Sequence, residues 1–538
     1  MSMELQQLLN KDYQQEFSRT SALVCARRER EELLRGGSPP PAAAGLSRRD
    51  QYAKEANHLH SSHILVDEQI NIALEAREHL TSQRQTFKRM QTRFNDIANR
   101  FPMLNSLIYR INARKRRDSL ILVDQFMEGL LSKESYDTPS DTVSHEKLEI
   151  KLPEWFDEKL FKKGQRFYCR FCFGISYSML TGLVALFAIP TILEVLAGSR
   201  RSSTKYTAYK RYVATFLHIQ SWYTCELKPG SVSWKSLTAV RSAHIKNGRA
   251  ARLKKKGTVS QRDVALTLFS LVGPGILKPD RFGIRQLEAD DWEAYNHYWA
   301  VIGYMLGLED RYNVCRRNIY ETRQVFQLLL DRVFVPCLEN VPEYFEHMAR
   351  VMMDGLWAVM GATESDSLMY ITKNLFDVPG FIIFEGERIN LQRRLREQLG
   401  GKHKDTGVDV STIIEKSCID GLPDTPPRLL YLKDYESLET SPEYKKLSYD
   451  SKFKLGTLCF IMSVYSTTIG RVLLNWYYRF SMFMTEYLPY VAFFLYGIKK
   501  SYVDMFKDPD MDSTPPKPNS WYNNRKPEPW YKTFIGFW

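Results

Sequence analysis

Residues 87–111 read FKRMQTRFNDIANRFPMLNSLIYRI, and their apolar side chains recur at alternating steps of three and four residues. This spacing gives a period of 3.5 residues, which keeps one apolar stripe of a helix facing a partner helix, as in a coiled coil. The stretch therefore predicts an assembling helix. Its seam consists of Phe87, Met90, Phe94, Ile97, Phe101, Leu104, Ile108 and Ile111.

A polar residue interrupts this seam on its N-terminal side. Continued backwards from Phe87, the same steps reach Gln83 first, and then Leu80, Ala76 and Ala73. A buried polar seam residue lowers stability but fixes register and partner number, because misalignment leaves it unpaired. Two interpretations remain open: an ordinary oligomerisation helix, or a seam in which Gln83 specifies the assembly.

Two runs around the seam resemble a known family. Residues 81–85 read TSQRQ, and residues 99–122 read NRFPMLNSLIYRINARKRRDSLIL. They resemble the end of the Qb-class Golgi SNAP receptors, a likeness that covers roughly residues 10–122. The resemblance implies that Gln83 forms the central layer of a four-helix bundle and that residues 66–111 bind other SNARE helices. It also implies a role in ER–Golgi or intra-Golgi transport.

The chain departs from that family just after the basic run. A transmembrane anchor follows there in the Golgi SNAP receptors, whereas this chain continues VDQFMEGLLSKE from residue 123. Such a charged stretch cannot span hydrocarbon. The segment is thus expected to bind partner helices without transmitting force through an anchor of its own.

Composition limits the class of protein. The 538 residues are 44% hydrophobic and 13% aromatic, enough for a sizeable helical core in two or more units. The net charge of +13 suits an anionic membrane surface or phosphate. No zinc-finger or aromatic–basic RNA pattern is present, so we expect no nucleic acid partner. The eight scattered cysteines indicate a reducing compartment, and Cys169 and Cys172 are expected to be packing residues.

Changes in composition predict the domain organisation. Few alternating strand patterns occur, so the fold class is expected to be all-α: a coiled-coil SNARE-type helix followed by a globular, mostly helical domain. The predicted parts are a helix and Gly/Pro/Ala linker (1–49), a SNARE-type segment (50–122), a linker (123–150), the helical domain (151–505) and a Pro/Trp-rich tail (506–538), which should lie extended over the surface.

The larger domain contains a histidine on an apolar helix face. Residues 234–256 read WKSLTAVRSAHIKNGRAARLKKK, which places Leu237, Val240 and His244 on one side of a helix. A histidine in this position is more often a hydrogen-bonded core residue. The alternative is a neutral imidazole that binds a metal or haem iron.

An upstream helix offers possible partners for this histidine. Residues 205–223 read KYTAYKRYVATFLHIQSWY, so Arg211 and Thr215 lie at positions i and i+4 of one helix face. There they could donate hydrogen bonds to bound oxygen or to a propionate group. By itself such a pair is a weak signal.

The order and spacing of these helices resemble the domain shared by rubber oxygenases and the ER-bound oxygenase mpaB, over about residues 155–380. Further matching positions are Arg241, three residues before His244, the helix from Ser260 to Thr267, and then His297, Trp299, Gly303, Leu306 and Gly307.

This resemblance implies a cofactor and a reaction. His244 would be the proximal ligand of a b-type haem, which Arg241 would help to bind, and Arg211 and Thr215 would line the distal pocket. O₂ would bind there before oxidative cleavage of an alkene or isoprenoid-type substrate. Glu194 lies near the position of the family's catalytic glutamate, and Ala214 replaces a lysine that caps the iron in rubber oxygenases. His297 is expected to be structural, beside a close helix contact at Gly303 and Gly307.

Two apolar stretches bear on membrane attachment. Residues 175–197 are long enough to span a bilayer, but Pro190 and Glu194 favour a buried core helix. Residues 455–498 contain several charges, so we expect long core helices or an interfacial surface. The sequence thus predicts a membrane-associated protein on the cytosolic face of the ER or Golgi membrane.

Three functions follow from these observations. The first is a haem-b-dependent, oxygenase-like enzyme fused to a SNARE segment. The second is a Golgi Qb-SNARE with an appended domain, and the third is a haem-free helical domain that binds lipid.

Overall fold

The structure, a computed structural model, describes residues 122–141, 148–285, 287–360, 364–400, 407–410, 419, 421–422 and 428–523. The chain divides into two units, Met1–Ile111 and Asn112–Trp538. The described residues all belong to the second unit. The predicted seam from Phe87 to Ile111 and its Gln83 lie outside them.

The second unit is built from helices, as the sequence predicts. The strands in its described part are one antiparallel pair, β1 (Val408–Asp409) and β2 (Leu429–Leu430). The first helices are α4 (Lys133–Asp137), α5 (Glu158–Leu186), α6 (Pro190–Ser199), α7 (Lys205–Thr224), α8 (Val232–Leu253), α9 (Gln261–Leu277), the 3₁₀ turn η2 (Pro279–Phe282), α10 (Ala289–Met305) and the 3₁₀ turn η3 (Asp310–Tyr312).

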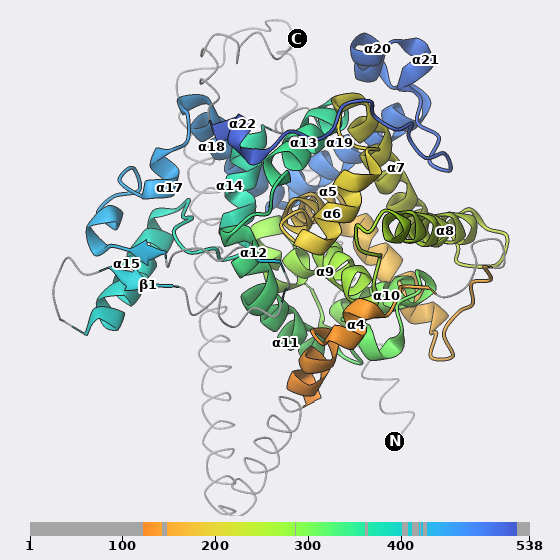
Figure 1. The fold of residues 1–538 in the computed structure, drawn as a ribbon, viewed down its shortest axis with the longest axis horizontal. Helices are drawn as coiled ribbons and strands as arrows, with labels where there is room; N and C mark the ends of the chain where they lie inside the picture. Colours follow the sequence, from red (N-terminus) through yellow and green to blue (C-terminus); the bar gives the residue numbers. More distant parts are fainter. Residues whose placement is uncertain are drawn as a thin grey trace, which may run out of the picture. The chain divides into compact units, whose positions relative to one another are not determined.

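The later helices follow in the order shown by the colours from green to blue in Figure 1. They are α11 (Ile319–Leu329), the π-helical turn η4 (Leu330–Phe334), α12 (Val335–Glu339), α13 (Phe345–Met360), α14 (Ser365–Leu375), α15 (Glu385–Leu399), the 3₁₀ turn η5 (Leu432–Tyr435), α17 (Pro442–Lys445), α18 (Tyr449–Tyr465), α19 (Thr468–Tyr487), α20 (Tyr490–Tyr496), α21 (Ile498–Ser501) and α22 (Asn519–Asn523).

Helix α5 is the central element of the core. Asp157 caps it by accepting hydrogen bonds from two backbone N–H groups, and its C-terminal half is buried on all sides. Helices α7, α9, α10, α14 and α19 pack around it. Among the described residues it is the one helix long and apolar enough to cross a membrane, but 83% of its apolar window is buried in the protein. The apolar stretch 175–197 is thus divided between α5 and α6, inside the fold.

Three stacked tyrosines fix α7 and α10 against α5. The rings of Tyr168 and Tyr223 lie 3.8 Å apart at an angle of 4°, and those of Tyr223 and Tyr298 lie 4.5 Å apart at 6°. Aromatic pairs add to the free energy of burial of their rings. The stack therefore holds α7, which carries Arg211 and Thr215, in a defined position.

The C-terminal tail crosses the surface back to the start of α7 and on to α13, as the dark blue trace in Figure 1 shows. Asp508 forms an ion pair with Arg201, and Asp512 accepts hydrogen bonds at the N-terminus of α7. Farther on, the side chain of Asn519 accepts a hydrogen bond from the backbone of Glu346 in α13. Over its described length the tail therefore runs across the surface, ends in the short helix α22, and fastens the start of α7.

Candidate functional site

His244 lies on α8, beside Arg211 of the adjacent helix α7. Its ring is half-buried, and its Nδ1 atom has no solvent contact and no hydrogen-bond partner in the described part of the protein. Burial and the nearby positive charge of Arg211 lower the pKa of His244 to about 4. The imidazole is therefore neutral near pH 7, the form that binds a metal ion.

Arg211 and Thr215 occupy the α7 side of this site. Arg211 donates a hydrogen bond of 3.2 Å from Nη1 to the Ser199 hydroxyl at the end of α6, and so ties α6 to α7. The Thr215 hydroxyl donates to the Arg211 carbonyl at 3.0 Å. Because that hydrogen is used within the helix, the Thr215 oxygen remains free to accept a bond rather than donate one.

Glu194 stands apart from this pair. It lies on α6 with its side chain exposed, and no hydrogen bond or ion pair joins it to another residue that the structure describes. The structure thus brings Arg211 next to His244 but shows no contact between Glu194 and either of them.

Arg241 is engaged in holding the fold. Its Nε lies 2.5 Å from Oδ2 of Asp141, whose side chain is 4% exposed, and its Nη1 donates to the Met305 carbonyl at 3.3 Å. A Cβ atom on Gly307, where φ is +100°, would lie 2.9 Å from the Ser140 carbonyl oxygen and 3.2 Å from Arg241 Nε. The glycine therefore lets three segments meet at this ion pair.

Sequence reasoning gave no indication that Asp141 is the partner of Arg241. The two residues are 100 positions apart. Asp141 lies within the segment predicted as a linker (123–150), where no helical or strand pattern indicates the position of its side chain.

The predicted structural role of the His297 motif is confirmed. Nε2 of His297 accepts a hydrogen bond of 3.1 Å from the Asp157 backbone, at the cap of α5. Trp299 is fully buried. A Cβ atom on Gly303 would lie 2.8 Å from a methyl group of Leu268, so α10 and α9 approach closely there.

Ser236 is a residue that the sequence did not single out. Its hydroxyl lies 2.7 Å from Nδ1 of His218 and accepts a hydrogen bond of 2.7 Å from the Trp222 indole. Through these two contacts Ser236 joins α8 to α7, two helical turns before His244. A serine on a helix gives no signal in the sequence that would reveal such a role.

The chemistry at His244 fits one histidine ligand rather than a cluster of ligands. Within the described ranges, no three His, Cys, Asp or Glu side chains come together as a metal site would require. The neutral ring of His244, whose Nδ1 has no partner, would suit a cofactor that brings the other ligands of its metal with it. Every residue from Thr238 to His244 is half-buried, as are Ala214 and Thr215 on α7.

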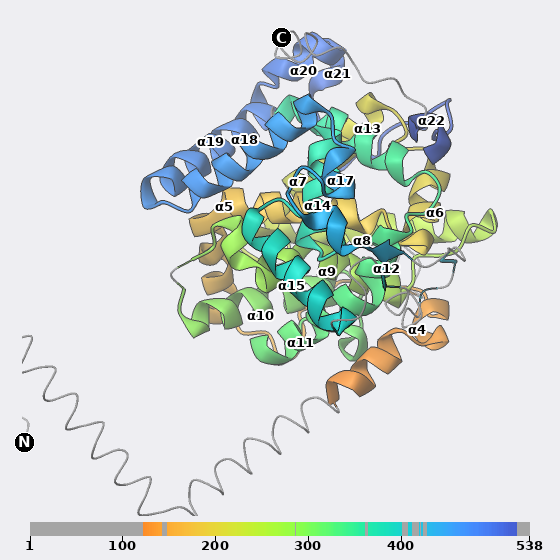
Figure 2. The ribbon, with the colours of Figure 1, turned by 90° about the vertical axis from the view of Figure 1, so that its left-hand side faces the viewer.

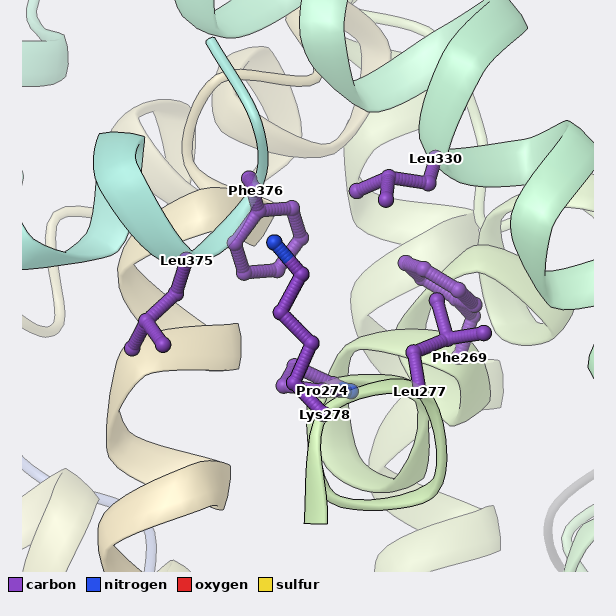
Figure 3. Close-up of a pocket in the computed structure, with 7 residues that line it drawn as sticks. All are labelled: Phe269, Pro274, Leu277, Lys278, Leu330, Leu375 and Phe376. Atoms are coloured by element: carbon purple, nitrogen blue, oxygen red, sulfur yellow. The ribbon is translucent and has the colours of Figure 1, made fainter. Parts of the chain in front are cut away.

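Two cavities lie elsewhere in the domain. The smaller, about 10 Å³, has room for about one water molecule, and Figure 3 shows the Lys278 side chain lying across it beside Phe376. The larger, about 420 Å³, is bordered by the end of α18, with Met462 and Ser463, and by Arg281 and Arg285. Neither cavity is lined by His244.

Comparison with known proteins divides the chain. Residues 50–115 match the family described as the Snare region anchored in the vesicle membrane C-terminus. Residues 173–404 match the family described as the ER-bound oxygenase mpaB/B'/Rubber oxygenase, catalytic domain.

Relatives of the first part are curated Golgi proteins. Golgi SNAP receptor complex member 1 of Drosophila melanogaster is 59% identical over 115 residues, which is 20% of this chain and 50% of that protein. The Homo sapiens protein of the same name is 44% identical over 117 residues, 21% of this chain and 47% of its own. The chain thus spans about half the length of the curated relatives that it matches.

A solved structure of latex clearing protein in the closed state is similar with a TM-score of 0.35 and 17% identity, and the match covers 62% of this chain and 84% of that one. The two family matches alone divide the chain into a segment similar to SNAREs, over residues 50–115, and a region similar to mpaB and the rubber oxygenases, over residues 173–404.

Proposed function

We propose that the larger domain binds haem b through His244 and acts as an oxygenase on an alkene or isoprenoid-type substrate. The observation that carries the proposal is the orphaned Nδ1 of a neutral His244 beside Arg211, in a region that matches an oxygenase catalytic family. A buried ring nitrogen without a partner lowers stability, and a ligand bond or a bound partner would remove that cost.

The residues present would hold the cofactor as follows. A ring nitrogen of His244 would bind the iron, and the Arg211 guanidinium would attract an anionic propionate or polarise bound O₂. Thr215 would accept a hydrogen bond on the same side, and Arg241 would contribute only if its ion pair with Asp141 opened. Bound haem would supply the O₂ chemistry that amino-acid side chains lack. Glu194 would serve as a base only if α6 moved it towards the site.

The test is the absorption spectrum of the full chain loaded with haem, compared with His244→Ala. A Soret band that disappears in the variant supports His244 as ligand. A matched control is His297→Ala, because His297 is hydrogen-bonded at the α5 cap and should leave the band unchanged. Folded protein without a Soret band after haem addition would contradict the proposal and favour a haem-free, lipid-binding domain.

A second function belongs to the other part of the chain. We infer that residues 66–111 join partner SNARE helices at the Golgi membrane, with Gln83 in the central layer, because the matching relatives are Golgi SNAP receptors. Assembly with those helices should be lost in Phe87→Asp and kept in Lys88→Ala, which lies beside the seam. Equal binding of both variants would contradict the inference. On this basis we place the protein at the cytosolic face of the Golgi or ER membrane.

A further inference from the structure

The outer face of α19 is apolar. Trp476 is 65% exposed and Ile469 76% exposed, and the large side chains between and after them are exposed as well. Water-exposed helix faces are normally polar. The exposed apolar residues of α19 are Ile469, Val472, Leu473, Trp476, Tyr477, Phe480, Phe483 and Tyr487.

The inner face of α19 carries polar anchors. The side chain of Asn475 accepts a hydrogen bond from the Phe173 backbone and donates one to the Arg170 carbonyl, both on α5. The Ser481 hydroxyl donates to the Val359 carbonyl on α13 at 2.6 Å. These bonds fix the rotation of the helix, so its apolar stripe cannot turn inward without breaking them. Tyr478 and Met482 are buried on the inner face as well, and Arg479 and Glu486 are exposed among the outer apolar residues. Helix α19 thus has large apolar side chains on both faces, unlike a surface helix in water.

Exposed apolar side chains also occur on the helices that precede and follow α19 in the chain. Figure 2 shows α18 and α19 side by side, with α20 and α21 beyond them. Together with α19, the following exposed residues form what we call the α18–α20 face: Tyr449, Phe453, Phe460, Leu488, Tyr490, Val491, Phe494 and Leu495. So many exposed large apolar side chains on neighbouring helices indicate an interaction surface.

The composition of the face points to lipid. Its tryptophan and tyrosines are the side chains that favour the interface between water and hydrocarbon. The exposed Lys499 and Lys500 follow it directly, at a place suited to anionic headgroups. Helices α18 and α19 together pass the hydropathy test for a membrane span, but they are bent by 113°. A bent pair with one side bound to the core suits insertion into one leaflet.

We propose that the α18–α20 face inserts into the interfacial layer of an anionic bilayer and holds the larger domain on the membrane without crossing it. The proposal deepens the membrane localisation given above and is independent of haem, so the two can fail separately. These helices follow residues 173–404, so the match to the oxygenase family does not include them.

The test is flotation of the full chain with vesicles of phosphatidylcholine, with and without phosphatidylserine. A Trp476→Glu, Phe480→Glu double variant should lower the partition coefficient at least about tenfold, since charges replace inserted rings. The matched control is Tyr320→Glu on α11, an aromatic residue that is 69% exposed and lies outside the face. It should float as the unchanged chain does. Circular dichroism and a thermal melt check that each variant is folded.

Two further measurements sharpen the result. Lys499→Glu with Lys500→Glu should remove most of the preference for phosphatidylserine. Quenching of intrinsic fluorescence by brominated lipid should fall in Trp476→Phe, which keeps an apolar side chain. Unchanged flotation of the Trp476→Glu, Phe480→Glu variant would overturn the proposal. So would a dimer in solution that these substitutions dissociate without any effect on flotation, because a second copy would then cover the face.

Discussion

The carboxylate of Asp512 lies 2.7 Å from the hydroxyl of Thr207, although 305 residues separate the two in sequence. Asp512 also accepts hydrogen bonds from the Ser203 backbone N–H and the Thr204 hydroxyl, both at 2.8 Å. A carboxylate at a helix N-terminus satisfies free N–H groups and faces the positive end of the helix dipole. The tail thus supplies a cap to α7, the helix that carries Arg211.

Asp512→Ala should destabilise the domain by about 1 to 3 kcal/mol, because it leaves buried donors at the start of α7 unpaired. The measurement is urea unfolding followed by circular dichroism. Asp510→Ala, an exposed residue of the same tail, is the control and should change stability by less than about 0.5 kcal/mol. Equal midpoints for the two variants would show that the cap contributes nothing.

The ion pair of Arg241 and Asp141 leads to a second prediction. Arg241→Met should destabilise the domain by about 1.5 to 3 kcal/mol, since it removes the charged hydrogen bond to the buried Asp141 carboxylate. A double-mutant cycle with Asp141→Ala should show strong coupling between the two residues. If Arg241 binds the cofactor instead, the variant will lose haem affinity while its unfolding curve stays in place.

Gly307 and Gly386 form a matched pair of alanine substitutions. Gly307→Ala should destabilise by more than about 1 kcal/mol, because its φ is +100° and the new Cβ would crowd the Ser140 carbonyl. Gly386→Ala, on α15, meets nothing within 4 Å and should be neutral or stabilising by up to about 1 kcal/mol. Thermal melts of both variants check the contrast, and a reversed order would contradict it.

His244 should make the domain sensitive to acid. Its pKa of about 4 in the folded protein lies below the ordinary value of 6.5, so the unfolded chain binds the proton more readily. The neutral His244 therefore makes its full contribution to the free energy of unfolding above about pH 6.5. This contribution is lost as the pH drops towards 4, which lowers the free energy of unfolding by up to about 3 kcal/mol. His244→Gln should flatten that part of the curve. Parallel curves of unfolding free energy against pH would contradict the prediction.

Helical periodicity predicts much of this fold. The spacing of apolar residues indicates an all-α domain, and the glycine pattern at the end of α10 indicates a close helix contact. Both patterns can be recognised because each extends over only a few helical turns of the sequence. Arg211 and Thr215 were placed on one helix face by the same reasoning. The position of Arg211 beside His244 depends on the packing of α7 against α8.

Periodicity could not reveal contacts between distant segments. Asp512 and Asp141 find their partners only after the chain folds, and neither lies in a periodic stretch. Periodicity also shows that α19 has an apolar stripe but not which way the stripe faces. That is decided by Asn475 and Ser481, whose hydrogen bonds with α5 and α13 turn the stripe outward.

The central position of α5 has a consequence during synthesis. The hydroxyls of Tyr168 and Tyr478 meet across 310 residues, so α19 can cover its side of α5 only after nearly the whole domain has been translated. At a translation rate of roughly 5 to 20 residues per second, the side of α5 that contacts α19 stays uncovered for about 15 to 60 s. Throughout that interval the nascent chain exposes this apolar surface, to which chaperones and nearby membranes can bind.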